Sequence, residues 1–380
     1  NVALFTAGIG TLIFHLVTGG QIPIFLASSF AFIAPILAAK TRFGLEETLG
    51  GLMAAGLLYV ALSAAIKLRG TGFISRLLPP VVIAPVIMTI GLGLAPIAVH
   101  MASGRTGDGS AVLVPYDTAI WVAMTSLLVT IVVAVWAKGI FRMIPIMFGV
   151  LVGYALSAVL GIVDTSPIAE APWFAVPNFV TPEFSWSAVL FMLPVAIAPA
   201  IEHIGDILAI GNVTRKNYLE KPGLHRTLLG DGLATSAASM LGGPPNTTYS
   251  EVTGAVMLTR NFNPRIMWWA AIVAIVLAFV GKFGAALQTI PAPVMGGILC
   301  LLFGSIAVVG LNTLIRNQVD LSQSRNLVIV GVTLVFGIGN LVLGQLEGIA
   351  LCAVVAVVLN LVLPGSKEAW GKRVNEPATD

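Results

Sequence analysis

Charged residues are scarce in this sequence. Only 10% of its 380 residues are Asp, Glu, Lys or Arg, 57% are hydrophobic, and the mean hydropathy is +0.97. Soluble globular domains carry about 25% charged residues, so this composition excludes a soluble domain and predicts a polytopic membrane protein within the lipid bilayer. The net charge of +3 is small and indicates no nucleic-acid partner.

Cysteine and histidine are also rare. The two cysteines, Cys300 and Cys352, lie in apolar runs, which favours small buried hydrophobes over a disulfide framework. The histidines and cysteines show no metal-ligand spacing, no glycine-rich loop follows a strand pattern, and no nucleophile is paired with a base. We therefore expect no enzyme, no metal and no cofactor.

Long apolar runs make up most of the chain. Thirteen are long enough to cross a bilayer: 1–18, 23–39, 46–67, 80–101, 116–137, 143–162, 185–210, 224–242, 245–259, 265–281, 290–310, 324–340 and 344–363. With the loop at 211–223 in the cytoplasm, 16 of the 20 Lys and Arg residues fall inside and 4 outside, as the positive-inside rule requires. Residues 364–380 then form a cytoplasmic tail.

The start of the chain suggests a further span. In this topology Asn1 lies on the outer face and inside an apolar run, so we expect a missing upstream helix and fourteen spans in the full protein. Fourteen is twice seven, which suggests two inverted repeats. "LLPPVV" (77–82) and "TIPAPV" (289–294) lie seven spans apart, as do the interrupted segments "IPIFLASSFAFIAP" (22–35) and "GGPPNTTYSEVTG" (242–254).

The two interrupted segments predict a transport site. Pro244 and Pro245 stop a helix, and the threonines and tyrosine that follow favour extended backbone. Extended backbone is tolerated at membrane depth only when it is paired or faces a polar cavity. We therefore expect these segments to pair as short antiparallel strands at mid-membrane, followed by half-helices whose N-terminal dipoles point at the site. Such a frame of N–H and C=O groups suits a flat heterocycle better than an anion.

Carboxylates within the predicted spans are the second indication of a site. A charge at the bilayer centre costs at least roughly 2.5–3.5 kcal/mol, so such residues usually face a cavity and act there. Four of the 17 acidic residues fall in spans: Glu202, Asp206, Asp231 and Glu251. Asp231, in the small-residue helix "GDGLATSAAS", is better explained by a structural hydrogen bond.

Glu202 and Asp206 are four residues apart and share one helix face. Two carboxylates that close in a poorly solvated site do not both ionise readily, so one proton is retained near neutral pH. This pair has the minimum equipment for proton symport. His203 lies about 100° around the helix and is better explained as a packing or supporting residue than as the proton carrier.

Several motifs resemble one transporter family. They are "IPIFLASSFAFIAPIL" (22–37), "IPIMFGVLVGYALSAVLGIVDTSPI" (144–168), "EHIGD" (202–206), "KPGLHRTLLGDGL" (221–233), "PPNTTYSE" (244–251), "GAVMLTR" (254–260) and "PAPVMGG" (291–297). Together they resemble the nucleobase–ascorbate transporters, or nucleobase:cation symporters, and most closely their bacterial uracil permeases. The similarity runs from residue 1 to about residue 363.

The resemblance implies an all-α fold of fourteen helices divided into a core and a gate domain. The core comprises residues 1–67 and 171–286, and the gate comprises 68–170 and 287–363. It further implies a homodimer in the bacterial inner membrane that works by an elevator-like motion, with H⁺ rather than Na⁺ as the coupling ion.

The resemblance also implies roles for particular residues. The carboxylates of Glu202 and Glu251 would hydrogen-bond the base, and position 206 would couple the proton. The remaining substrate contacts would come from backbone groups of two residues and from side chains lining the site: Phe30 and Ser250, then Ser29, Tyr249 and Phe303.

Three departures concern the substrate. Uracil permeases typically have histidine at the position of Asp206, whereas aspartate is more usual in the purine and ascorbate branches. Val252 stands where the family has asparagine, and Phe303 stands where a tyrosine is typical. Uracil is therefore the first expectation and xanthine or a related purine the second. An anion transporter of the sulfate-permease type is an alternative of another class, but two mid-membrane glutamates argue against it.

Overall fold

The computed structural model describes residues 1–70, 72–344 and 346–365, and helices form most of this part of the chain. The α-helices are α1 (Val2–Thr18), α2 (Ile33–Phe43), α3 (Leu45–Arg69), α4 (Gly72–Leu77), α5 (Pro80–Gly93), α6 (Ala95–Ala102), α7 (Tyr116–Trp136), α8 (Pro145–Val159), α9 (Ser166–Glu170), α10 (Trp186–Val195), α11 (Ile197–Thr214), α12 (Leu224–Met240), α13 (Ser250–Thr259), α14 (Arg265–Ala278), α15 (Gly281–Gln288), α16 (Ala292–Arg316), α17 (Ser324–Ile338) and α18 (Gly348–Val362). The shorter elements are the helical turns η1 (Phe30–Phe32), η2 (Gly139–Met143) and η3 (Leu219–Gly223), and the strands β1 (Leu26–Ser28), β2 (Asn246–Thr248), β3 (Val342–Leu343) and β4 (Leu346–Glu347).

Five stretches of helix in the described residues are long and apolar enough to cross a membrane. They are Leu45–Arg69, Pro80–Ala102, Tyr116–Trp136, Trp186–Thr214 and Ala292–Arg316. Five shorter apolar helices are 10–17 residues long: α1, α8, α14, α17 and α18. The polytopic character expected from composition is therefore confirmed, while the count of thirteen spans stays a prediction.

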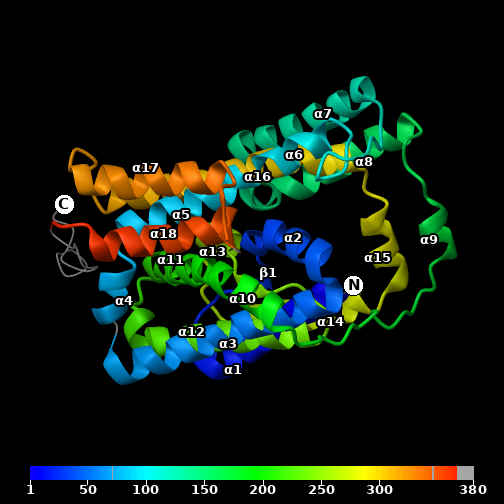
Figure 1. Ribbon diagram of the computed structural model, residues 1–380. Coiled ribbons are helices and arrows are strands. Elements are labelled where there is room, and N and C mark those ends of the chain that lie inside the picture. The colour runs from blue at the N-terminus through cyan, green and yellow to red at the C-terminus, as the bar shows by residue number, and fades with distance from the viewer. Residues whose placement is uncertain (71, 345, 366–380) are drawn as a thin grey trace.

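The helices lie in two packed groups, as Figure 1 shows. In one group α3 packs on α12, and α1 packs on α12 and α14. In the other group α16 packs on α5, α6 and α7, while α17 packs on α5 and α18. The neighbours repeat between the two halves of the chain: α14 lies on α1 as α3 lies on α12, and α7 lies on α8 as α17 lies on α18. Two structural repeats produce such a pattern.

The interrupted segments meet as an antiparallel pair of strands. Leu26 pairs with Thr248, Ala27 with Thr247 and Ser28 with Asn246. Backbone hydrogen bonds extend the ladder at both ends, from Ser29 N to Pro245 O at 2.9 Å and from Tyr249 N to Phe25 O at 3.2 Å. The predicted pairing of these two segments is therefore confirmed.

The outer edges of both strands are satisfied by side chains of flanking helices. On β1, the Thr11 hydroxyl of α1 accepts from Leu26 N at 2.9 Å and lies 3.1 Å from Leu26 O. On β2, the Thr235 hydroxyl of α12 donates to Asn246 O at 2.6 Å. The Asn246 side chain in turn donates to Thr6 O at 2.7 Å. These bonds matter because unpaired backbone groups at membrane depth cost several kcal/mol each.

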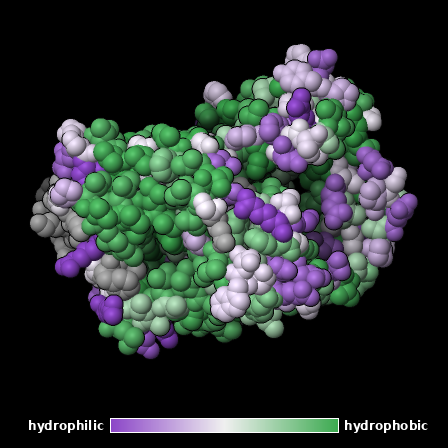
Figure 2. All heavy atoms as spheres, in the orientation of Figure 1, coloured by the Kyte–Doolittle hydropathy of each residue, from purple (hydrophilic) through white to green (hydrophobic). Residues whose placement is uncertain are grey.

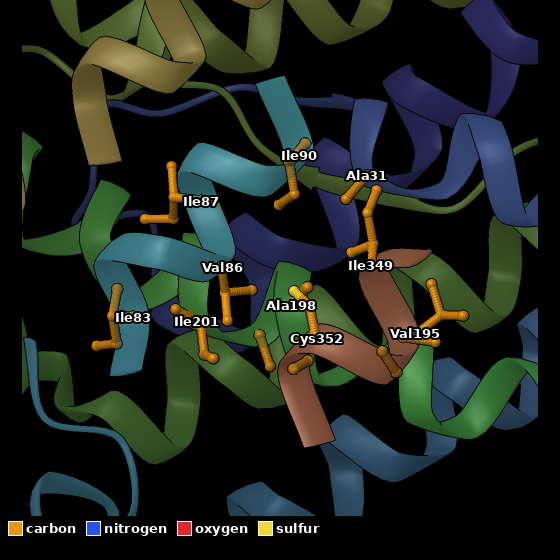
Figure 3. Close-up of a cluster of buried hydrophobic side chains, with 14 of the residues drawn as sticks. Ala31, Ile83, Val86, Ile87, Ile90, Val195, Ala198, Ile201, Ile349 and Cys352 are labelled. Atoms are coloured by element: carbon orange, nitrogen blue, oxygen red, sulfur yellow. The ribbon is translucent and has the colours of Figure 1, made fainter. Parts of the chain in front are cut away.

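Apolar side chains fill the space between the two helix groups and also cover much of the outside. In the space-filling view, large continuous hydrophobic areas face outward (Figure 2), and many large aliphatic and aromatic side chains are exposed, as a bilayer-embedded protein requires. Figure 3 shows the buried cluster between α5, α11 and α18. Its members include Ile83, Val86, Ile87, Ile90, Ala198, Ile201, Ile349 and Cys352.

The structure corrects several predicted span boundaries. The expected span 344–363 begins as a helix only at Gly348, because the paired strands β3 and β4, at residues 342–343 and 346–347, precede it. The expected span 265–281 ends at Ala278, and a separate helix, α15, starts at Gly281. Hydropathy alone missed both breaks, since the mean hydropathy of a largely apolar run does not show where its helix begins or ends. Most of the predicted tail 364–380 lies outside the described residues.

Candidate functional site

The site is built where each strand gives way to a helix. After β1 the chain turns through η1, which begins at Phe30, into α2, and after β2 it enters α13 at Ser250. The first N–H groups of a helix have no partner within that helix and carry the positive end of its dipole. Because the strands are antiparallel, the two helix starts lie at opposite ends of a ladder only three residue pairs long.

Three aromatic side chains named from the sequence come together here. The rings of Phe30 and Tyr249 are stacked, with centroids 6.2 Å apart and an interplanar angle of 16°. Phe303 of α16, only 1% exposed, meets Phe30 edge-on at 5.9 Å. The Tyr249 hydroxyl donates to Ser28 O at 2.7 Å. This bond holds the ring of the second broken segment against the end of the first strand.

Glu202 lies on α11, which packs against α13. Its Oε2 is buried and has no hydrogen-bond partner among the described residues. Glu251, in the first turn of α13, is exposed.

Asp206 lies one turn beyond Glu202 and is 4% exposed. The Thr248 hydroxyl of β2 donates to Asp206 Oδ2 at 2.8 Å. The same hydroxyl lies 3.3 Å from His203 Nδ1, which is 3.6 Å from Asp231 Oδ1. Asp206, Thr248, His203 and Asp231 are thus neighbours in a buried polar chain, in which the 3.6 Å between His203 and Asp231 is too long for a hydrogen bond.

The sequence did not indicate this chain. Asp231 was expected to make a structural hydrogen bond, and its Oδ2 does lie near the Thr247 hydroxyl, at a long 3.5 Å. Thr247 and Thr248 were expected only to favour extended backbone. The one available signal was the position of Thr247 and Thr248 in an intramembrane segment. A hydroxyl buried there needs an acceptor, and intramembrane carboxylates can provide one.

The structure places the backbone of the other two predicted site residues, Ser29 and Ser250. Ser29, which is 4% exposed, belongs to the extended ladder through its N–H, and its buried hydroxyl has no hydrogen-bond partner in the described part of the chain. Ser250 begins α13, but its side chain lies outside the described part of the structure. The structure thus brings Phe30, Tyr249 and Phe303 together and places Glu202 and Asp206 on the helix face beside β2.

Comparison with known proteins decides the family. The family model described as "Permease family" matches residues 1–346, which is most of the chain. The chain belongs to the nucleobase–ascorbate transporter family. Its members are membrane transporters, so the chain is a transporter rather than an enzyme.

Curated relatives of this permease cover nearly its whole length. A probable uracil permease of Pasteurella multocida is 59% identical over 371 residues, covering 97% of this chain and 88% of the relative. The uracil permease of Bacillus caldolyticus is 45% identical, with 100% of this chain and 89% of that protein covered. The uracil permease of Escherichia coli K12 is 41% identical, with 95% and 84% covered.

Solved structures share the fold of this permease at low identity. The transmembrane domain of the cyanobacterial bicarbonate transporter BicA aligns with a TM-score of 0.62 at 17% identity, covering 95% of this chain and 93% of that one. The murine anion transporter Slc26a9, in an inward-facing state, aligns with a TM-score of 0.67 at 15% identity, covering 95% and 63%. This likeness concerns the fold alone.

Proposed function

We propose that this permease is a proton-coupled nucleobase symporter and that its substrate is uracil. The observation that carries the proposal is the meeting of the two broken segments, which stacks Phe30 on Tyr249 beside a ladder flanked by two helix starts. The names of the curated relatives, uracil permeases from three organisms, support the choice of uracil.

A flat base fits the chemistry of this site. Aromatic rings bind heterocycles by stacking, and the nearly parallel rings of Phe30 and Tyr249 offer such a face after a small separation. Carboxylates accept hydrogen bonds, so Glu202 and Glu251 would take the N–H groups of the base. Backbone N–H groups at the starts of η1 and α13, at Phe30 and Ser250, would donate to its carbonyls.

Proton coupling is assigned to Asp206 together with Glu202. The two carboxylates lie one turn apart on α11, and Asp206 is tied to the strand beside the substrate by the Thr248 hydroxyl. Substrate binding would change the protonation of this pair, because a base that donates N–H to Glu202 favours the ionised carboxylate, the stronger acceptor. The proposed coupling ion is therefore H⁺ rather than Na⁺.

The transport motion proposed here is of the elevator type. The core domain, residues 1–67 and 171–286, would carry the site past a gate domain, residues 68–170 and 287–363. The apolar contact between α5, α11 and α18 supports this division, since aliphatic surfaces slide without breaking hydrogen bonds. We further propose two inverted repeats of seven helices, a homodimer and a cytoplasmic C-terminus in the bacterial inner membrane.

Two other classes of substrate, purines and anions, are alternatives to uracil. Aspartate at position 206 and Val252 keep xanthine or a related purine as the second candidate. An anion substrate draws on the likeness to BicA and Slc26a9, but the carboxylates of Glu202 and Glu251 would repel an anion at the strand ends. The gathered side chains are carboxylates, hydroxyls and aromatics.

The test is a binding screen on purified wild-type protein with uracil, thymine, xanthine, hypoxanthine, guanine, adenine, urate and bicarbonate. Ligand that binds the folded state raises the thermal midpoint, and uracil is expected to raise it at the lowest concentration. Glu251→Gln should abolish that response while leaving the unliganded midpoint within a few degrees of wild type. A response to bicarbonate without one to any base would overturn the proposal, and an intact uracil response in Glu251→Gln would overturn the site.

A further inference from the structure

One ion pair joins the two helix groups. Arg42 Nη2, in the last turn of α2, lies 2.7 Å from Oε2 of Glu347, the residue that directly precedes α18. The partners are 305 residues apart in sequence. Across the described residues, this is the one pair in which Arg or Lys meets a carboxylate within 4 Å.

Both partners are held in place by their surroundings. The Arg42 guanidinium lies 5.2 Å from the centre of the Phe191 ring of α10, a cation–π contact. Phe43, the next residue, meets the same ring edge-on at 5.9 Å. Glu347 ends the β3–β4 hairpin, where it pairs with Val342. With 44% exposure for the Arg42 side chain and 17% for Glu347, the pair is only partly in contact with solvent.

The pair stands at the edge of an otherwise apolar contact. Between α5, α11 and α18 the two groups meet through aliphatic side chains such as Val86, Ile201 and Ile349 (Figure 3). Apolar surfaces are non-directional and do not select one relative position of two bodies strongly. A charge-assisted hydrogen bond selects one geometry, because it is directional and is lost beyond about 3.5 Å.

We propose that Arg42 and Glu347 form a latch between the core and gate domains, closed in the state seen here and opened once in each transport cycle. The inference rests on the proposed elevator motion. Because α2 follows directly from β1 and η1, movement of the substrate site relative to α18 must carry Arg42 away from Glu347. Under the predicted topology the latch lies at the outer end of the protein, so its closure favours the state in which the outer path is shut.

Cross-linking tests this latch directly. The double variant Arg42→Cys/Glu347→Cys, in a Cys300→Ser/Cys352→Ala background, is reconstituted in liposomes and treated with a short, reducible bis-thiosulfonate. We expect uracil uptake to fall at least about tenfold on cross-linking and to return on reduction, while the reagent leaves the uptake of each single-cysteine variant unchanged. Uptake that continues in the fully cross-linked protein would refute the latch.

A charge exchange provides the second measurement. Breaking a partly exposed ion pair changes an equilibrium by about 1.5- to 5-fold, so Arg42→Glu, which also adds repulsion, should change the initial uptake rate about 2- to 10-fold. Arg42→Glu/Glu347→Arg should restore it, and Lys40→Glu, on the exposed face of the same helix end, should leave it unchanged. An uptake rate that is the same in Arg42→Glu and wild type would count against the latch. Absence of uptake by wild type would instead refute the proposed function.

Discussion

Replacing Phe30 by alanine tests the central feature of the proposed site. Phe30 makes two aromatic contacts, with Tyr249 at 6.2 Å and with Phe303 at 5.9 Å. Stacking of a base on an aromatic side chain is worth about 1–3 kcal/mol by alanine substitution. Since about 1.4 kcal/mol is a factor of ten in affinity, Phe30→Ala should weaken uracil binding about 5- to 150-fold. Phe30→Tyr, which keeps the ring, should stay within about threefold of wild type.

The assay is isothermal titration of detergent-purified protein with uracil, combined with the thermal midpoint of the unliganded protein. The matched control is Phe5→Ala, because Phe5 is also half-buried and also makes two ring contacts, with Phe179 at 5.2 Å and Phe279 at 5.7 Å. Both alanine variants should lower the midpoint through lost packing. Only Phe30→Ala should lose affinity. If both lose affinity equally, or if Phe30→Ala binds within twofold of wild type, the stacking argument is wrong.

Three further outcomes are expected. Asp206→Asn should retain uracil binding but lose accumulation driven by a pH gradient; accumulation with unchanged pH dependence would show that Asp206 does not couple the proton. Thr235→Val should cost about 1–3 kcal/mol of unfolding free energy, because it leaves the buried Asn246 carbonyl without its donor, and Thr259→Val, exposed at the end of α13, should change it far less. In the loop 103–115, hydrogen bonds from neighbouring hydroxyls and a backbone N–H lower the pKa of Asp108 from 3.8 to about 2. Because these bonds favour the ionised carboxylate, they stabilise the folded loop fully above about pH 4, and this stabilisation is lost as the pH falls toward 2. Hydrogen exchange of the loop should therefore rise over that window in wild type and not in Asp108→Asn.

The strand pair shows how far local chemistry reaches. Pro244 and Pro245 remove backbone donors, and the residues after them favour extended backbone, so the break in the apolar run was readable. The need to pair that backbone at membrane depth then pointed to the other interrupted segment. Phe30 and Tyr249 each lie just beyond their own strand, at opposite ends of the antiparallel pair, so the pairing alone does not predict that their rings stack. Phe303 was reached only through the family resemblance.

The polar chain behind the strands could not be read in the same way. His203 and Asp231 meet only because α11 and α12 are rotated so that these two side chains face each other at 3.6 Å. Helix rotation depends on packing with every neighbour, and no local pattern encodes it. The same holds for Thr11 and Thr235, whose hydroxyls satisfy strand edges, since buried threonines occur in many membrane helices without such a role.

By itself the sequence determined the membrane class, the two broken segments, their pairing and the carboxylates beside them. Each of these follows from the cost of placing charges or unpaired backbone in a bilayer, which acts on a residue wherever the chain folds. Tertiary structure alone decided the polar chain from Asp206 to Asp231 and the ion pair of Arg42 with Glu347, 305 residues away. Those contacts depend on side-chain directions to within an ångström, and only the packing of whole helices sets such directions.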